Sequence, residues 1–210
     1  MKNFILLLLI TLFSSTVYAQ SKQDFTKYGV KSGTLGEGLQ VGDTAPDISG
    51  VDQHGKQVSL NSMLKQGPVA VVFYRGYWCP VCNRELKSLQ NNIAMITEAG
   101  GQVLVVSPEK RSEVQKIASK VEASFPIVGE AQQVVNDYKV GFEVTDGYQE
   151  KVDKMLSIDI AEKNAADKAL LPVPATFVVG QDGKVVYRQF DPNYRNRASA
   201  EDITKAIKSI

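Results

Sequence analysis

Residues 69–89 decide the fold, and they read VAVVFYRGYWCPVCNRELKSL. The run from Pro68 to Tyr74 is continuously apolar and rich in β-branched residues, which is typical of a central strand covered on both faces. Cys79 and Cys82 follow directly behind it. Apolar residues then recur at helical spacing until Gly100-Gly101 stops the pattern, at Leu86, Leu89, Ile93 and Ile96. Both thiols are therefore predicted where a buried strand passes into a helix.

The same alternation continues downstream. Residues 102–106 predict a second buried strand, residues 109–120 a helix, and residues 125–127 a short strand. Strands that alternate with helices indicate βαβ units and a parallel sheet.

The C-terminal part predicts a different arrangement. Residues 175–179 and 184–187 flank Asp182-Gly183, a pattern typical of a β-hairpin. Residues 200–210 predict an amphipathic helix that Ser199 caps. Residues 146–170 are helical in pattern and lack a strand signal, so we interpret them as an insertion over the fold.

The cysteine pair allows three interpretations: a redox pair, half of a zinc site or a structural staple. A closed zinc site usually takes four Cys and His ligands, but the chain offers two cysteines and one histidine, His54. A disulfide that closes so short a loop removes only about 2 kcal/mol of unfolded-state entropy. Redox chemistry is therefore the favoured interpretation.

A reactive thiol needs a pKa below its usual value of about 8.5, because the thiolate is the nucleophile. If a helix begins at Pro80, Cys79 lies at its cap, and we expect Cys79 to be the more exposed and the more acidic thiol. Arg75 and Arg84 are close enough in sequence to add positive charge, although both could equally be solvated surface residues.

Other candidate residues carry two interpretations each. Pro174 begins a predicted strand and is either an edge-strand start or a cis turn beside the active site. His54 lies in a probable turn and is expected at the surface. The aromatic residues around the cysteines are either a substrate surface or part of the core: Tyr74, Tyr77 and Trp78.

The N-terminus has the pattern of a secretory signal peptide, with Lys2, the apolar run Phe4 to Phe13 and a cut after Ala19. An uncleaved anchor is disfavoured, because the run is about half of the ~20 residues that span a bilayer. We expect a signal peptide at 1–19, a polar lead-in at 20–40 and one domain at 41–210. The mature protein would be periplasmic or otherwise exported, without further membrane contact.

Composition sets broader bounds on function. The chain is 43% hydrophobic and 22% charged, which is ordinary globular material. A net charge of +1 without a basic run gives no reason to expect a nucleic-acid partner. The chain carries neither a glycine-rich dinucleotide fingerprint nor a haem-attachment motif, so no cofactor is expected.

Three stretches resemble the peroxiredoxin-like branch of the AhpC/TSA family: residues 42–47, 73–86 and 171–177. This resemblance implies a thioredoxin-like α/β fold, in which helices flank a central mixed β-sheet and a helical insertion precedes the C-terminal β-hairpin. It implies a redox-active pair at Cys79 and Cys82, with a cis peptide before Pro174 facing it. The tail at 191–197 also resembles this branch and would bring Arg197 toward the site. The supporting residues would be Arg75, Trp78, Pro80, Pro174 and Arg197.

The chain departs from ordinary peroxiredoxins at two positions. With Cys82 as the peroxide-attacking cysteine, Arg75 and Cys79 occupy the places of the family's proline and threonine. The threonine hydroxyl orients the peroxide, whereas a thiol is a weak donor. A second thiol at that position favours thioredoxin-type exchange.

Two activities therefore remain open. In a peroxidase, one thiolate attacks the peroxide, the other cysteine closes a disulfide, and a thioredoxin-like protein reduces it. In a thiol-disulfide oxidoreductase, Cys79 attacks a substrate disulfide and Cys82 resolves the mixed disulfide. The peroxidase is the favoured hypothesis. A non-enzymatic binding module is a third interpretation, but it needs neither cysteine.

Overall fold

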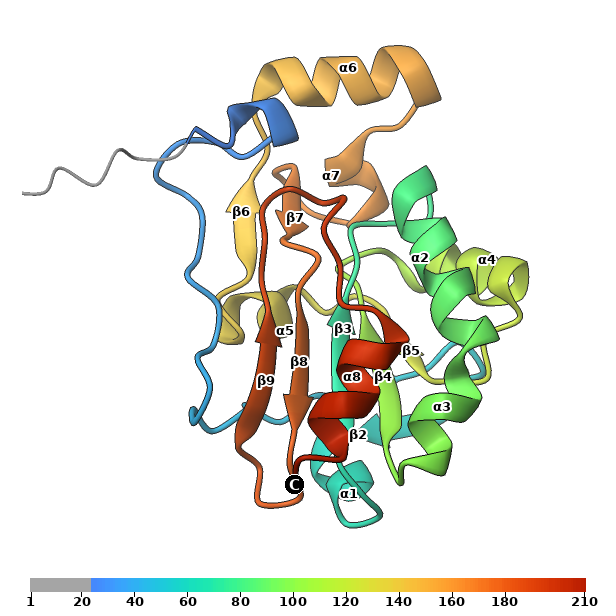
Figure 1. Ribbon diagram of the computed structural model, residues 1–210. Coiled ribbons are helices and arrows are strands. Elements are labelled where there is room, and N and C mark those ends of the chain that lie inside the picture. The colour runs from blue at the N-terminus through green and yellow to red at the C-terminus, as the bar shows by residue number, and fades with distance from the viewer. Residues whose placement is uncertain (1–23) are drawn as a thin grey trace, which may run out of the picture.

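A five-stranded mixed sheet forms the centre of the computed structural model, which describes residues 24–210 (Figure 1). The strand order is β5-β4-β3-β8-β9, with β3, β4 and β5 parallel and with β8 and β9 antiparallel to their neighbours. All residues of β3 and β8 are buried, which explains why their sequences are apolar apart from Thr176. The strands are β3 (Val69–Phe73), β4 (Gln102–Val106), β5 (Ile127–Val128), β8 (Thr176–Val179) and β9 (Val185–Gln189).

Helices flank this sheet on both sides. In Figure 1, α8 lies in front of the sheet with α3 beside it, and these two helices contact each other. On the other face, Tyr138 at the end of α5 packs its ring against Phe73 at 5.2 Å and Phe177 at 5.8 Å. The helices of this unit are α1 (Leu60–Leu64), α2 (Pro80–Asn91), α3 (Ile93–Glu98), α4 (Arg111–Val121), α5 (Gln132–Asp137) and α8 (Ala200–Ile207).

The predicted central elements are confirmed. The helix after the cysteines breaks at Asn92 into α2 and α3, and Gly100 ends it with a φ of 83°, a conformation that glycine adopts without strain. The hairpin turns at Gly183, whose N–H donates to the carbonyl of Gly180. Ser199 caps α8 through a reciprocal pair of hydrogen bonds with Asp202.

The predicted insertion contains α6 (Asp146–Leu156) and α7 (Ile160–Lys163). A small antiparallel pair, β6 (Gly141–Glu143) and β7 (Leu170–Pro172), brackets these two helices and fixes where the insertion leaves the main unit. The sequence pattern did not predict this pair, nor α1, α5 and the hairpin of β1 (Ser49–Val51) and β2 (Gln57–Ser59). Each is short, so its hydrophobic periodicity is too brief to detect.

The first part of the segment 24–40 packs beside the start of the insertion. After the 3-10 helix η1 (Thr26–Tyr28), Val30 is buried and bridges to Val144 at the start of the insertion. The Tyr148 ring of α6 packs so tightly on Gly29 that a side chain there would meet the ring at 2.7 Å. This part of the lead-in therefore helps to hold α6 in place.

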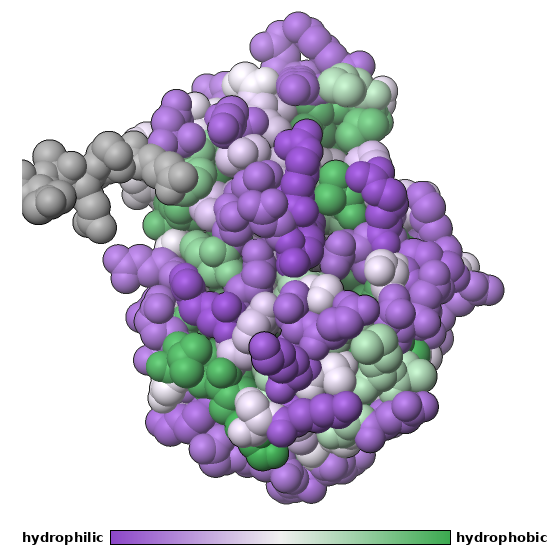
Figure 2. All heavy atoms as spheres, viewed as in Figure 1, coloured by the Kyte–Doolittle hydropathy of each residue, from purple (hydrophilic) through white to green (hydrophobic). Residues whose placement is uncertain are grey.

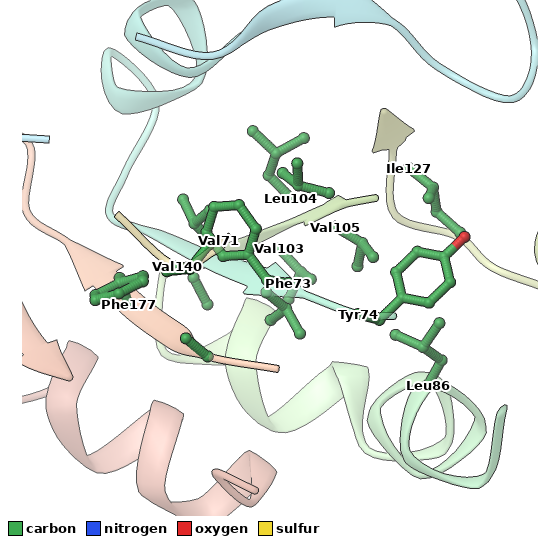
Figure 3. Close-up of a cluster of buried hydrophobic side chains, with 14 of the residues drawn as sticks. Val71, Phe73, Tyr74, Leu86, Val103, Leu104, Val105, Ile127, Val140 and Phe177 are labelled. Atoms are coloured by element: carbon green, nitrogen blue, oxygen red, sulfur yellow. The ribbon is translucent and has the colours of Figure 1, made fainter. Parts of the chain in front are cut away.

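The core continues from the sheet into α2. Figure 3 shows Phe73 and Phe177 packed together beside Val71 and Val140, and their two rings are 6.1 Å apart. In the same view Tyr74, the residue after β3, lies close to Leu86 of α2. Both side chains are almost fully buried. The strand end and the helix start that frame the cysteines are thus anchored in one core.

The molecular surface drawn in Figure 2 is mostly hydrophilic, with apolar residues in separate patches. The large apolar side chains exposed in the described part of the chain are few, and only two of them are neighbours, at the end of α6: Val41, Met95, Met155, Leu156 and Ile210. Within residues 24–210, no helix is long and apolar enough to cross a membrane. The predicted signal peptide and its cut after Ala19 lie outside the described residues.

Candidate active site

Helix α2 begins at the cysteine pair. Pro80 is its first residue and Cys79 is its N-cap, whose sulfur accepts a hydrogen bond from the backbone N–H of Cys82 at 3.4 Å. Proline suits this position, because the first N–H groups of a helix have no partner within it. Both cysteines are free thiols. The positive end of the helix dipole therefore faces the two sulfurs.

Neighbouring side chains, called the cover below, enclose the cysteine pair. Cys79 is 1% exposed and Cys82 is 0% exposed. Of the residues beside them, Trp78 is buried while Pro80 is exposed. Water hardly reaches sulfurs at this depth, so any substrate needs some movement of the side chains that enclose them, and a folded protein needs far more movement than a peroxide does.

Arg75 forms one half of the cover. Its Nη2 donates to Sγ of Cys79 at 3.1 Å, and its Nη1 donates to the hydroxyl of Tyr148 at 2.7 Å. Its guanidinium also stacks on the Tyr194 ring at 3.7 Å and lies 5.3 Å from the Trp78 ring. Arg75 is only 2% exposed, so its charge is enclosed with the thiols.

Arg197 forms the other half. Its Nη2 donates to Sγ of Cys82 at 3.3 Å, and its Nε donates to the carbonyl of Tyr194 at 2.7 Å. The segment between β9 and α8 carries both Tyr194 and Arg197. This segment thus places Arg197 against the sulfur of Cys82. It also places the Tyr194 ring against Arg75, which contacts the sulfur of Cys79.

The two sulfurs titrate as a pair. Burial alone would raise the pKa of Cys82, but the hydrogen bond from Cys79 and the charges of Arg197 and Arg75 hold it well below the usual value. The hydrogen bond to Cys82, together with burial, raises the pKa of Cys79 instead. In the reduced site Cys82 is therefore the more acidic thiol, which ionises first, and Cys79 keeps its proton to higher pH.

This result corrects the expectation for Cys79. The sequence predicted that Cys79 would be the more acidic thiol because it caps the helix, but Cys82 has the lower pKa. Exposure hardly distinguishes the two residues. The expectation weighed only the helix dipole and omitted the hydrogen bond between the two cysteine side chains and the charge of Arg197 beside Cys82.

The expected cis peptide before Pro174 is also wrong, since no cis peptide bond occurs among the described residues. Pro174 is buried between β7 and β8, where the Val173 N–H donates to the carbonyl of Val140 and the Ala175 N–H donates to that of Val173. These bonds hold the chain as it enters β8, and the trans isomer is the lower in free energy for most X–Pro bonds.

The remaining candidates divide between the site and the surface. Tyr77 is half-buried and its N–H points into the protein, whereas Tyr74 is fully buried in the core. Arg84 is exposed on α2 and contacts neither sulfur. His54 is exposed and its backbone N–H donates to Asp52 in a turn.

Three contributors to the site were missed by sequence reasoning: Tyr148, Tyr194 and Glu109. Tyr194 lies within the tail that resembles the family, so that motif could have indicated it. Tyr148 reaches the site from the insertion and Glu109 from the loop after β4. Both contacts join segments far apart in the sequence, so the local spacing of residues cannot predict them.

A shallow groove of about 560 Å³ runs beside the start of α2. Its lining combines two aromatic residues and Pro80 with three basic side chains, together with Asn83 and Val121. Lys120 also lies 5.5 Å from the Tyr77 ring. The lining residues are Tyr77, Trp78, Pro80, Asn83, Arg84, Lys87, Lys120 and Val121.

A buried dithiol between two arginines, at the point where a central strand passes into a helix, defines a thiol-dependent oxidoreductase. The AhpC/TSA family model matches residues 41–188. The chain belongs to the AhpC/TSA family.

Known relatives fall into two functional classes. The chain is 28% identical to the thiol-disulfide oxidoreductase ResA of Geobacillus thermodenitrificans, over 100% of this chain and 94% of that protein. It is 33% identical to the peroxiredoxin Bcp of Escherichia coli, over 49% of this chain and 65% of that protein. The peroxidoxin BcpB structure from Mycobacterium tuberculosis matches with a TM-score of 0.63 and 21% identity, over 82% of this chain and 98% of that one, which confirms the thioredoxin-like fold.

Proposed function

We propose that this oxidoreductase is an exported peroxidase that reduces hydrogen peroxide or organic hydroperoxides through Cys79 and Cys82. The observation that carries the proposal is the enclosure of both sulfurs under Arg75 and Arg197. Such a site suits a substrate of a few atoms. The two guanidinium groups also supply donors to the oxygen on which negative charge develops when a peroxide bond breaks.

The proposed reaction has two steps. The Cys82 thiolate attacks one peroxide oxygen, so that an S–O bond forms while the O–O bond breaks, and the alkoxide or hydroxide takes a proton. The Cys79 thiol then attacks the resulting sulfenic acid, which closes the disulfide and releases water. Cys79, whose sulfur accepts a hydrogen bond from the backbone N–H of Cys82, is thereby already placed to resolve it.

A thioredoxin-like protein is the proposed reductant, because the disulfide must be reduced in each cycle and oxidising compartments need a dedicated donor. Its proposed docking surface is the groove beside Pro80, whose basic lining suits an acidic partner surface. The proposed exported location rests on the sequence pattern of residues 1–19.

Thiol-disulfide exchange is the second candidate, and a specific observation favours it. The residue that caps α2 is Cys79, where ordinary peroxiredoxins have a threonine. Its sulfur accepts a hydrogen bond from the backbone N–H of Cys82, and the attacking thiol of an exchange enzyme would take the same place at a helix start. In that activity the cover formed by Arg75, Tyr148 and Tyr194 would have to open for every substrate.

Steady-state turnover separates the two candidates. The mature protein is supplied with a thioredoxin-like reductant and offered either hydrogen peroxide or a folded protein with mispaired disulfides. We expect peroxide turnover and little disulfide turnover. Turnover of the disulfide substrate alone would assign the protein to exchange instead. Cys82→Ser is the control that must abolish both.

A further inference from the structure

A buried carboxyl group lies behind the active-site loop and has no role in the reaction proposed above. Glu109, between β4 and α4, is 0% exposed. Its Oε2 accepts a hydrogen bond from the backbone N–H of Tyr77 at 2.7 Å and one from the Tyr74 hydroxyl at 3.4 Å. Glu109 therefore ties the loop that runs into Cys79 to the core.

The other oxygen of this carboxyl group has no hydrogen-bond partner within residues 24–210, and neither has Nε1 of Trp78. Both atoms face Gly76, where an added Cβ would lie 2.7 Å from Oε1 of Glu109 and 2.3 Å from the indole nitrogen. In the described part of the chain, no lysine or arginine lies within 4.0 Å of this carboxyl group. An ionised carboxylate so enclosed is costly, so the group holds a proton.

Titratable groups act on Glu109 from each neighbouring element. Cys82 in α2 and Glu113 in α4 act on it through their charges, and Tyr74 at the end of β3 donates a hydrogen bond to it. Lys116 and Lys163 pair with Glu113. Burial raises the pKa of Glu109 to about 8, the Tyr77 N–H opposes this, and the charges of Glu113 and Cys82 add to it. The proton on Glu109 is therefore linked to the thiolate charge.

The redox cycle requires a proton that the cysteines do not hold. One thiolate, one thiol, one hydroperoxide and one proton give a disulfide, an alcohol and a water, so oxidation consumes one proton beyond that of the Cys79 thiol. In the oxidised site the charge on Cys82 is gone, and an ionised Glu109 is then less unfavourable.

We propose that Glu109 stores this proton, releasing it when Cys79 and Cys82 form their disulfide and taking one up when the disulfide is reduced. The inference rests on the proposed function only in that the pair cycles between dithiol and disulfide. It holds equally for a peroxide or a disulfide as oxidant. Glu109 is thus a positioning residue for the loop and a proton store for the pair.

Redox titration against glutathione tests this proposal without any peroxide. The pH dependence of the midpoint potential counts the protons bound on reduction. The titration covers about pH 5 to about pH 9. On reduction of the disulfide, the wild type should bind two protons over part of this range. Above the Glu109 pKa of about 8 it should bind only one. Glu109→Gln keeps an acceptor for Tyr77 and should bind one proton throughout.

Glu113→Gln is the matched control, because it removes the neighbouring carboxylate and should retain the second proton. Equal proton counts for the wild type and Glu109→Gln would overturn the proposal. If Glu109→Gln does not fold, infrared difference spectra of the wild type decide the question. A protonated-carboxyl band that disappears on oxidation is expected, and one unchanged by redox state would overturn the proposal. A failure of peroxide turnover would leave either result intact.

Discussion

Arg197 donates a hydrogen bond to Sγ of Cys82 at 3.3 Å, although 115 residues separate the two in the sequence. Arg75 makes the corresponding contact with Cys79 at 3.1 Å from only four residues away. The chain thus encloses its dithiol between one guanidinium from the loop before α2 and one from the segment before α8. This pairing accounts for a thiolate in a site that water hardly reaches.

Arg197→Met should raise the pKa of Cys82, because burial then acts against a weaker positive field. Loss of a close opposite charge typically shifts a pKa by about 1–3 pH units. We expect the midpoint of the pH profile of iodoacetamide alkylation to move to higher pH by about this amount. The pH profile of alkylation measures this directly. Arg195→Met removes a neighbouring arginine that stacks on Tyr194, and it should leave the profile in place.

Tyr148→Phe should slow the reaction with peroxide while leaving the fold intact. The substitution keeps the ring that packs on Gly29 but removes the hydroxyl that fixes Arg75. A hydrogen bond to a charged group is worth about 1.5 kcal/mol or more, so we expect roughly a tenfold loss. Tyr194→Phe is the control, because its ring stacks on Arg75 without a hydroxyl contact to it. Equal losses in both variants would show that the Tyr148 hydroxyl has no special role.

Gly76→Ala should destabilise the protein by about 1–3 kcal/mol, the usual cost of overpacking. The new methyl group would meet both the indole nitrogen of Trp78 and the carboxyl of Glu109. Gly147→Ala is the matched control, because nothing lies within 4 Å of its added Cβ and alanine favours the helix α6. Urea unfolding of both variants measures the difference. A Gly76→Ala protein as stable as the wild type would contradict the close packing described for this loop.

The sequence predicted the order of strand, cysteine pair and helix correctly, because the strand and the helix each have a clear local hydrophobic pattern. The Pro68–Tyr74 run and the Leu86 and Leu89 spacing are examples. The contact of Tyr148 with Arg75 could not be predicted in this way. It depends on where α6 lies, and that is set by β6, β7 and the lead-in, which are too short or too irregular to recognise.

The candidate site shows the same division. The resemblance to the family indicated Arg197, and the structure places it on Cys82. The ionisation of the pair was mispredicted, because the electrostatics depend on distances between segments that the sequence does not contain. Glu109 was missed for a related reason: a single glutamate after a strand reads as a surface residue until its burial is known.

Glu109→Gln should change how the stability of the reduced protein depends on pH. The folded-state pKa of about 8 lies above the unfolded value of about 4.3, so the folded state binds the extra proton between them. The wild type should therefore lose stability relative to the variant as pH rises through this window, by at most about 1.4 kcal/mol per pH unit. Above about pH 8 the difference should level off. Parallel unfolding curves for the two proteins across the window would contradict a raised pKa.

The most direct test of the account is stopped-flow fluorescence of Trp78, the sole tryptophan, after the reduced mature protein is mixed with hydrogen peroxide. Its indole lies against Arg75 beside the pair, so oxidation should change its emission. We predict oxidation far faster than that of a free thiol, abolished in Cys82→Ser and retained in Cys79→Ser, where it stops at the sulfenic acid. Oxidation of the wild type no faster than a free thiol would contradict the peroxidase assignment and leave disulfide exchange as the activity of this site.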